Sequence, residues 1–257
     1  MKNYYYFIEI QYLGFRYHGW QKQNGVKTVQ GMVEKTLNFI FDHDNFKTLA
    51  AGRTDAMVSV NQSAFELFLR EPIDKDKLLV DLNFNLPADI KVLSIKEIDQ
   101  QFNIIQHAKL KEYLYLFSYG KKNHPFCAPF MSYINTDLNI DIMKTGAALF
   151  AGNHNFRQYV YKPNEAACFE REVLISEIVD NNIYTASFFP SDSYIFRVKG
   201  SGFLRYQVRL MMGTLFRLGK GEIVIEDIIQ SLKGEKNEII GYIAPSSGLI
   251  LNEVQFE

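Results

Sequence analysis

The order in which strand-like and helix-like segments alternate is the feature that most constrains the fold of this chain. Residues 4–11 (YYYFIEIQ) have the composition of a strand, and residues 29–42 carry a stripe of apolar side chains at helical spacing behind Thr28, a suitable N-cap. The other elements predicted in this half are strands at 46–51, 62–69 and 90–97 and a helix from Asp74 to about Leu82, before Pro87. This β-α-β-β-α-β order is that of a ferredoxin-like unit.

The second half of the chain has a similar alternation. It opens with a predicted strand at 111–119, in which Tyr113, Tyr115 and Phe117 alternate onto one face. The other elements predicted here are helices over 138–150, 203–218 and 225–233 and strands at 172–179, 184–189, 194–199 and 249–255. We therefore predict an α/β fold of the mixed α+β kind with two ferredoxin-like (RRM-like) halves, 1–105 and 106–257, because the weakest boundary lies near 100–110.

Length and composition exclude several classes of protein. A chain of 257 residues, 47% of them hydrophobic, can bury a core without a disulfide or a structural metal. The longest apolar runs are too short to cross a membrane, and the N-terminus lacks the apolar core of a signal peptide, so we expect a cytoplasmic protein with no membrane partner. Cys127 and Cys168 form no CxxC pair and predict neither a zinc site nor a disulfide framework.

The charge balance excludes a uniformly basic nucleic-acid binder, because 28 Lys and Arg residues face 29 Asp and Glu residues. The charges are nevertheless unevenly distributed. From Phe196 to Gly221 there is no acid, and the basic residues are Arg197, Lys199, Arg205, Arg209, Arg217 and Lys220. The acids that follow are Glu222, Glu226, Asp227, Glu235 and Glu238. A charge run is usually a solvated face, but this one is also compatible with a polyanion on one side.

The segment Gly52-Arg53-Thr54-Asp55 lies between two predicted strands. Glycine permits unusual backbone angles, and threonine and aspartate bond their own backbone in tight turns, so one interpretation is a hairpin turn that Asp55 caps. The other interpretation is a carboxylate held at a loop tip as a nucleophile or a base. Local spacing leaves both interpretations open.

Six segments, spread over nearly the whole chain, match the motifs of one family. Its pattern GRTDxGVHA is present as GRTDAMVSV at 52–60. The other five are GFRYHGWQKQ at 14–23 followed by TVQ at 28–30, NFNLPADI at 83–90, YLY at 113–115, FLRYQVR at 203–209 with Gly213 behind it, and APSSGLIL at 244–251. In these motifs the chain resembles the TruA family of tRNA pseudouridine synthases.

This resemblance implies an isomerase that needs no cofactor, since converting uridine to pseudouridine neither adds nor removes atoms. Asp55 would be the catalytic carboxylate, and Arg209 would be the partner that keeps it charged, because burial alone favours the neutral acid. Tyr113 would stack on the extruded uracil and Leu249 would line the pocket. Arg53 would fill the gap left by the flipped base or hold a phosphate.

The resemblance also implies partners. The family acts on uridines at positions 38 to 40 of the tRNA anticodon stem-loop and works as a homodimer, and its two α/β halves build a central mixed sheet, flanked by helices, with a catalytic cleft between them. The candidates for contacts with the RNA backbone, which would make binding salt-dependent, are Lys109, Lys111, Lys121, Lys122, Arg205 and Lys220.

The chain departs from the family pattern at three positions. Met57 and Ser59 replace a glycine and a histidine after the aspartate, and Lys111 stands where arginine is usual. The aspartate, the arginine and the tyrosine remain. Two alternatives therefore stay open beside the enzyme: a non-catalytic RNA-binding protein, or a paralogue with altered target positions. A structural α/β protein whose basic helix is merely solvated is a third.

Overall fold

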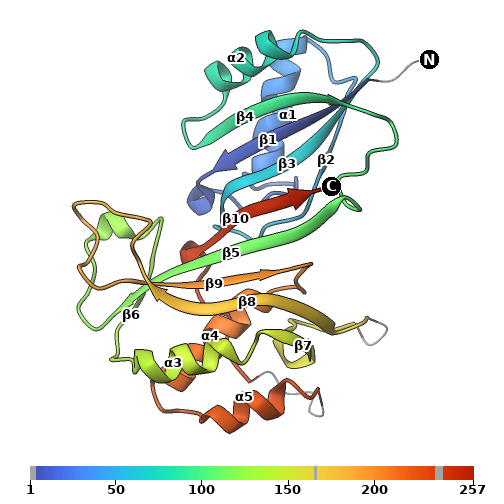
Figure 1. The fold of residues 1–257 in the computed structure, drawn as a ribbon. Helices are drawn as coiled ribbons and strands as arrows, with labels where there is room; N and C mark the ends of the chain where they lie inside the picture. The colour runs from blue at the N-terminus through green and yellow to red at the C-terminus, as the bar shows by residue number, and fades with distance from the viewer. Residues whose placement is uncertain (1–3, 165–166, 235–239) are drawn as a thin grey trace. The chain divides into compact units, whose positions relative to one another are not determined.

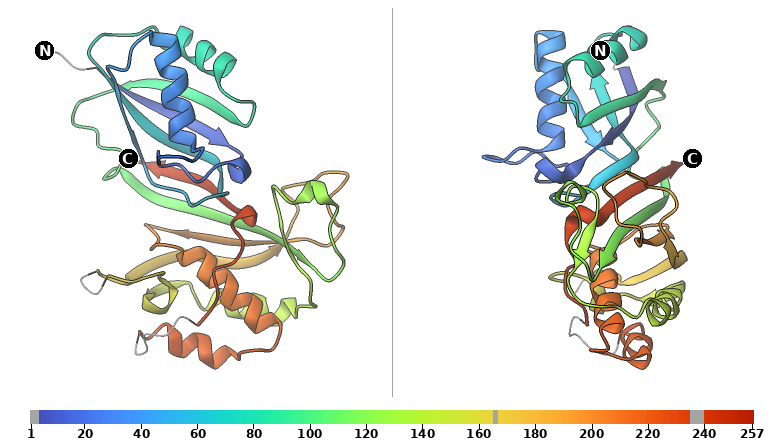
Figure 2. Two further views of the ribbon diagram at one scale, coloured as in Figure 1. Left: turned by 180° about the vertical axis from the view of Figure 1, so that it is seen from behind. Right: turned by 90° about the vertical axis from the view of Figure 1, so that its left-hand side faces the viewer.

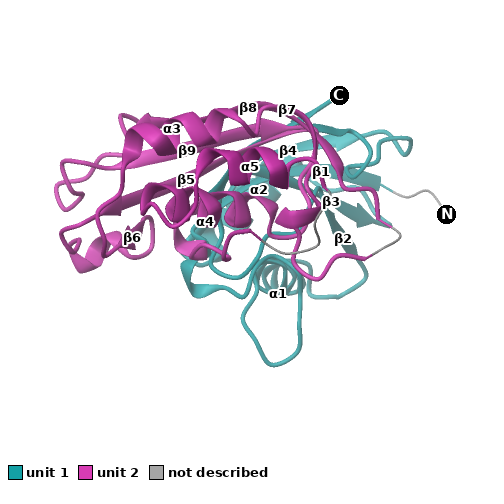
Figure 3. Cartoon of the chain, turned by 90° about the horizontal axis from the view of Figure 1, so that it is seen from below, with its two compact units in different colours: residues 1–109, 250–257 teal, residues 110–249 magenta. Residues whose placement is uncertain are grey.

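The computed structural model describes residues 4–164, 167–234 and 240–257, which form two compact units (Figure 1). Unit 1 comprises residues 1–109 and 250–257, and unit 2 comprises residues 110–249 (Figure 3). Glu235 and Glu238, two of the acids noted in the sequence, lie outside the described residues. In the part of the chain that the structure describes, no helix has the length and apolar character needed to cross a membrane.

Unit 1 has the predicted β-α-β-β-α-β order. Its elements are β1 (Tyr4–Tyr12), α1 (Val29–Phe41), β2 (Lys47–Ala50), β3 (Ser59–Leu69), α2 (Lys75–Asn85) and β4 (Ile90–Ile98). β1 lies between β4 and β3 and is antiparallel to both, and β2 is antiparallel to β3. The C-terminal strand β10 (Leu249–Phe256) runs parallel to β3, with Ile250 opposite Ser59, so the sheet is mixed.

The N-cap predicted at Thr28 is confirmed, and Asp74, where the second helix was predicted to start, is the N-cap of α2. The Thr28 side chain accepts a hydrogen bond from Gly31 N, and the Asp74 side chain accepts from two backbone N–H groups of α2. α2 runs three residues beyond Leu82, to Asn85, because only Leu86, directly before Pro87, is forced into the extended conformation. The two helices pack together on one face of the sheet (Figure 2).

Unit 2 also combines helices with a sheet. Its elements are β5 (Ala108–Tyr119), β6 (Ser132–Ile134), α3 (Ile140–Ala148), β7 (Gly152–Asn155), β8 (Glu170–Asp180), β9 (Tyr194–Gly200), α4 (Gln207–Gly219) and α5 (Ile225–Ser231). The strand order is β5-β9-β8-β7, antiparallel throughout, with β6 parallel to β5. The mixed α/β class is thus confirmed. β6 and β7 were not predicted, because strands of three or four residues show no periodicity.

The strand predicted at 184–189 is wrong. Asn181 Nδ2 donates to Tyr184 O, and Tyr184 N donates back to Asn181 Oδ1, so the chain turns here instead of extending. The apolar residues that suggested a strand pack in an aromatic cluster, in which the Phe188 ring lies 5.8 Å from that of Phe126 and 5.4 Å from that of Phe189. Aromatic packing between two loops thus replaces the predicted sheet pairing.

The helix predicted over 203–218 begins later, at Gln207. Tyr206 has a φ of 62°, a left-handed conformation through which an α-helix cannot continue. The Gln207 side chain accepts a hydrogen bond from Leu204 N at 2.8 Å and thereby stabilises this abrupt start. Every residue of α4 except Arg209 and Arg217 is buried, so α4 is the central helix of unit 2.

A substitution at Gly213, in the middle of α4, tests how tightly this helix is packed. Glycine inside a helix normally costs about 1 kcal/mol relative to alanine. At Gly213, however, a Cβ would overlap the backbone carbonyl oxygen of Tyr242. We therefore expect Gly213→Ala to lower the free energy of unfolding by about 1–3 kcal/mol in urea titrations. Gly202→Ala, where a Cβ meets nothing within 4 Å, is the control and should change stability far less. A stabilised Gly213→Ala variant would contradict the packing.

Candidate active site

Asp55 lies in the irregular loop 51–58, between β2 and β3. Val58 N donates to Asp55 O at 3.3 Å and closes a turn directly after the aspartate, so a turn is indeed present at this motif. The Asp55 side chain is partly exposed and Arg53 is exposed. The loop therefore leaves both side chains reachable from solvent while its backbone is tied down.

The backbone of this loop is held by the segment that follows β1. Trp20 N donates to Thr54 O at 3.3 Å, and Met57 N donates to Tyr17 O at 2.9 Å. The Tyr12 hydroxyl lies 2.8 Å from Thr54 Oγ1. Gly19 has a φ of 80°, and a Cβ there would overlap Thr54 O, so only glycine fits this contact. Two of the six motifs thus form one rigid structure around Asp55.

A third motif anchors the same segment. Asp89 receives a hydrogen bond from Arg16 Nε at 2.7 Å and one from the Tyr17 hydroxyl at 2.6 Å, and its carbonyl accepts from Leu13 N at 2.9 Å. Burial favours a raised pKa for the Asp89 carboxyl, but these two side-chain donors outweigh it and hold the pKa below the ordinary value. Burial and the Asp89 carboxylate together raise the pKa of Tyr17. Asp89 is therefore a charged anchor of the segment.

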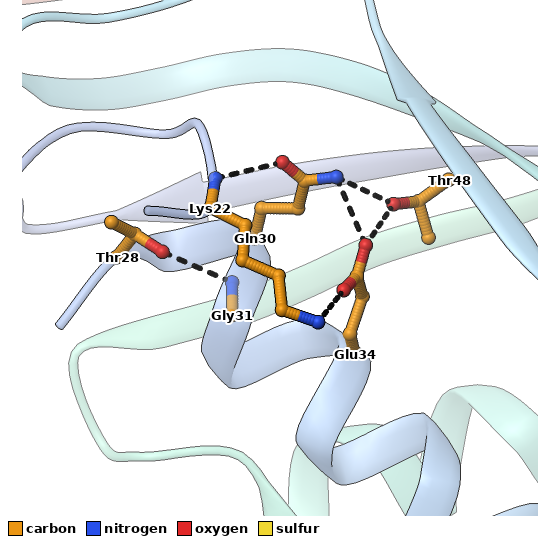
Figure 4. A network of polar contacts seen from close by, with 6 residues as sticks. All are labelled: Lys22, Thr28, Gln30, Gly31, Glu34 and Thr48. Atoms are coloured by element: carbon orange, nitrogen blue, oxygen red, sulfur yellow. Dashed lines mark hydrogen bonds and ion pairs between the residues drawn. The ribbon is translucent and has the colours of Figure 1, made fainter. Parts of the chain in front are cut away.

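The motif glutamine Gln30 ties the next part of this loop to α1 and β2 (Figure 4). Its Oε1 accepts from Lys22 N at 2.9 Å, and its Nε2 donates to Glu34 Oε1 at 2.9 Å and to Thr48 Oγ1 at 3.1 Å. Lys22 Nζ also pairs with Glu34 at 2.8 Å. The contacts give Gln30 a structural role.

The two departures from the family motif have distinct physical consequences. Met57 has a φ of 67°, so this position requires the left-handed conformation that the family's glycine adopts easily. Ser59 is buried, and its Oγ accepts from Gly14 N at 2.9 Å. Ser59 therefore stabilises the backbone beneath the loop, whereas Met57 strains it.

Substitutions at Met57 measure this strain. We expect Met57→Gly to be more stable than Met57→Ala by about 1 kcal/mol, because a left-handed residue with a Cβ costs roughly 1–2 kcal/mol, part of which the greater flexibility of unfolded glycine offsets. Both variants lose the methionine side chain, so comparing their urea midpoints isolates the backbone. The opposite order would show that the loop carries no strain at this position.

In unit 2, Arg209 lies on α4 and is only partly exposed. Its Nε donates to Ala244 O at 2.7 Å, while Ala244 N donates to Arg209 O at 3.1 Å. The guanidinium carbon lies 5.1 Å from the centre of the Tyr206 ring. The helix motif and the C-terminal motif therefore meet at Arg209, and its guanidinium has a defined orientation.

Tyr113 lies on β5 opposite Val198 of β9, partly exposed, and its ring contacts Phe203 edge-to-face at 5.4 Å. Tyr115, two residues along the same face, is fully buried, and its hydroxyl lies 2.8 Å from both Ser132 Oγ and Pro245 O. Tyr115 is thus a core residue, whereas Tyr113 keeps part of its ring accessible. Leu249 is 5% exposed.

The predicted RNA-backbone residues fall into two groups. Lys109, Lys121, Lys122, Arg205 and Lys220 are exposed, whereas Lys111 is not. Lys109 pairs with Glu257 at 3.2 Å, and Lys220 lies 4.0 Å from Glu222. Lys111 is partly buried, and this burial lowers its pKa. Charge neutralisation and burial make Lys109 and Lys111 weaker candidates than Lys121 and Lys122.

The predicted site residues are divided between the units: Arg53 and Asp55 share one loop of unit 1, and Tyr113, Arg205, Arg209 and Leu249 belong to unit 2. Sequence reasoning missed Tyr206, whose ring contacts both Arg205 and Arg209. Its position between them in the helix motif was the available signal. Within the described ranges no group of three His, Cys, Asp or Glu side chains is placed to hold a metal ion, and Cys127 and Cys168 are free thiols.

Comparisons with known proteins agree with the motifs. A family model described as tRNA pseudouridine synthase matches residues 147–257. A solved structure, the archaeal box H/ACA sRNP Nop10-Cbf5 complex, aligns with 92% of this chain and 60% of its own at 14% sequence identity. The TM-score of this alignment is only 0.38.

Full-length relatives are more informative. The chain is 32% identical over 255 residues to tRNA pseudouridine synthase A of Dictyoglomus thermophilum, covering 97% of this chain and 98% of the relative. It is 30% identical over 252 residues to tRNA pseudouridine synthase A 2 of Bacillus thuringiensis, covering 98% and 99%. It is 30% identical over 249 residues to tRNA pseudouridine synthase A of Aquifex aeolicus, covering 97% and 98%. The chain therefore belongs to the tRNA pseudouridine synthase A family and is a pseudouridine synthase, an isomerase.

Proposed function

We propose that this isomerase converts uridine to pseudouridine in the tRNA anticodon stem-loop, at positions 38 to 40, with Asp55 as its catalytic carboxylate. The observation that carries the proposal is the loop of Asp55: its backbone is hydrogen-bonded to the segment 17–20, which Asp89 anchors, and Asp55 itself is partly exposed. A positioned but accessible carboxylate is what catalysis requires.

The reaction breaks the bond between uracil N1 and the ribose C1′, turns the base, and bonds C5 to the same carbon. The Asp55 carboxylate can serve it by adding to the ribose carbon, by adding to the base, or by removing a ribose proton. Each route needs the ionised form. We propose that Arg209 supplies the positive charge that favours this form, since a guanidinium is permanently charged and its orientation is defined by Ala244.

The remaining assignments concern the substrate. Tyr113 stacks on the flipped uracil, Leu249 lines the pocket, and Arg53, exposed beside Asp55, occupies the gap in the stem or holds a phosphate. Flipping the base costs a few kcal/mol, which these contacts offset. The active form we propose is a cytoplasmic homodimer, with basic residues of unit 2 on the tRNA backbone. The likeness to the family supports these assignments.

Asp55→Asn tests the carboxylate. We expect turnover to be lost, because the amide can neither attack nor take a proton, while the tRNA dissociation constant changes by less than about tenfold, roughly 1.4 kcal/mol. Tritium release from tRNA labelled at uracil C5 measures turnover, and filter binding measures affinity. Asp44→Asn, on an exposed loop of unit 1, is the matched control and should retain full activity. Retained turnover in Asp55→Asn would refute the assignment.

The same assays separate the alternatives. A non-catalytic RNA-binding protein would bind tRNA with the expected salt dependence and release no tritium in the wild-type form. A structural α/β protein would do neither. Met57 and Ser59 are the features that favour the non-catalytic alternative, although Ser59 also has a structural role in this chain, because its Oγ accepts a hydrogen bond from Gly14 N.

Arg209→Ala tests the proposed partner of Asp55. We expect kcat to fall about a hundredfold or more, because an electrostatic group aimed at the reacting centre is lost. Stability should fall by about 1.5–3 kcal/mol, because the charged hydrogen bond to Ala244 O is lost as well. Arg217 provides the matched control: it lies on the same helix, and its guanidinium donates to a backbone carbonyl of the same segment, Ile240 O.

Arg217→Ala should therefore lower the thermal midpoint by a similar amount and leave kcat nearly unchanged. If the two variants lost activity in proportion to stability, Arg209 would be a structural residue only. The pH dependence adds a second readout, because losing a positive charge near the carboxylate should move the acid limb of the kcat profile to higher pH in Arg209→Ala.

A further inference from the structure

Cations and tyrosine rings alternate along one line of contacts in unit 2. Lys162 Nζ lies 5.4 Å from the centre of the Tyr161 ring, and the guanidinium of Arg205 lies 5.5 Å from the same ring. Arg205 also lies 5.3 Å from the Tyr206 ring, and Arg209 lies 5.1 Å from that ring. We call these five residues the cation–tyrosine row. It runs from exposed Lys162 to partly exposed Arg209.

Two segments that are distant in sequence contact each other to form this row. Tyr161 N donates to Arg205 O at 3.3 Å, and the two tyrosine rings meet edge-to-face at 5.3 Å. Tyr206 and Lys162 both have left-handed backbones, with φ of 62° and 51°. Such conformations are unfavourable for side chains with a Cβ and persist only where surrounding contacts impose them. The row is therefore a built feature of the fold.

The positive charges of the cation–tyrosine row favour the binding of an anion. Three cations lie along two adjacent rings, and in the part of the chain that the structure describes neither Arg205 nor Lys162 forms an ion pair. Exposed cations that have no acidic partner attract the phosphates of a nucleic acid. A guanidinium held against a ring keeps its N–H edge free to donate to a phosphate.

We propose that the cation–tyrosine row binds the sugar–phosphate backbone of tRNA beside the reacting nucleotide, with Lys162 and Arg205 contacting phosphates and Tyr161 acting as a positioning residue for Arg205. The cations already contact the faces of both rings, which favours phosphate contacts over base stacking. The inference rests on the proposed function, because it takes tRNA as the ligand and Arg209 as the end of the row nearest the chemistry.

The salt dependence of tRNA binding tests Lys162. Each phosphate contact contributes about 0.7–0.9 to the slope of log K against log salt. We expect Lys162→Asn to reduce the slope by that amount, and asparagine accepts the positive φ at this position. Lys144→Gln on α3 is the control, because Lys144 is partly exposed and paired with Asp180 at 3.6 Å, and it should leave the slope unchanged.

Steady-state kinetics test Tyr161. An exposed cation–aromatic contact is worth a factor of roughly two to five in an equilibrium constant. We expect Tyr161→Leu to raise KM for tRNA by that factor with kcat within about twofold, because Arg205 is no longer held. Tyr161→Phe keeps the ring and should behave like the wild type. A merely structural tyrosine would instead lower the thermal midpoint and kcat together.

An unchanged slope in Lys162→Asn, or equal KM values for the leucine and phenylalanine variants, would overturn the inference. Its failure is distinguishable from failure of the proposed function. If wild-type protein releases no tritium but Lys162→Asn still lowers the binding slope, the row binds RNA and the catalytic proposal is wrong. If tritium is released and the slope is unchanged, the catalytic proposal stands and the row does not bind RNA.

Discussion

The backbone contact between residues 17–20 and residues 54–57 is the constraint on which the candidate site of unit 1 depends. Two N–H···O hydrogen bonds and the close approach of Gly19 to Thr54 O fix where the Asp55 loop runs. The first of these segments is fixed in turn by Asp89, a partly buried carboxylate that accepts hydrogen bonds from Arg16 and Tyr17. A short strand-to-strand loop would otherwise fluctuate, and a carboxylate on it would have no defined position. The family motifs of unit 1 therefore serve largely to fix the position of the loop that carries Asp55.

In unit 2, the largely buried helix α4 fixes the position of the candidate site residue Arg209. α4 carries two arginines that are not buried, and each donates to a backbone carbonyl of the segment that follows α5: Arg209 to Ala244, and Arg217 to Ile240. These bonds pair two carbonyls of an irregular segment that has no strand or helix partner for them in the described part of the chain, and they orient the guanidinium groups. Arg209 differs from Arg217 in its contact with Tyr206, which places it in line with Arg205. α4 thus supports the C-terminal segment and also contributes Arg209 to the cation–tyrosine row.

The departures from the family pattern show how a motif position can change without losing the loop. Ser59 accepts a backbone hydrogen bond from Gly14, so the residue that replaces the family histidine still ties β3 to the preceding segment. Met57 keeps the left-handed conformation that the family assigns to glycine. The loop around Asp55 therefore contains one strained backbone position, at Met57, and strain of this kind is a common property of functional loops.

Several features could be predicted from the sequence alone, because each depends on local spacing or on a motif. They are the order of elements in residues 4–98, the cap at Thr28, the start of a helix at Asp74, the face shared by Tyr113 and Tyr115, and membership of the family. Tertiary structure decided the rest. Residues 184–189 turn because Asn181 bonds back to Tyr184, and because Phe188 and Phe189 pack on Phe126 and Phe130 of another loop. α4 starts at Gln207 because Tyr206 is left-handed, and β10 pairs with β3 nearly two hundred residues away in sequence. Periodicity records which face of a segment is buried, but not which distant segment buries it, and the partners of Arg209, Asp89 and Tyr161 are all of that distant kind.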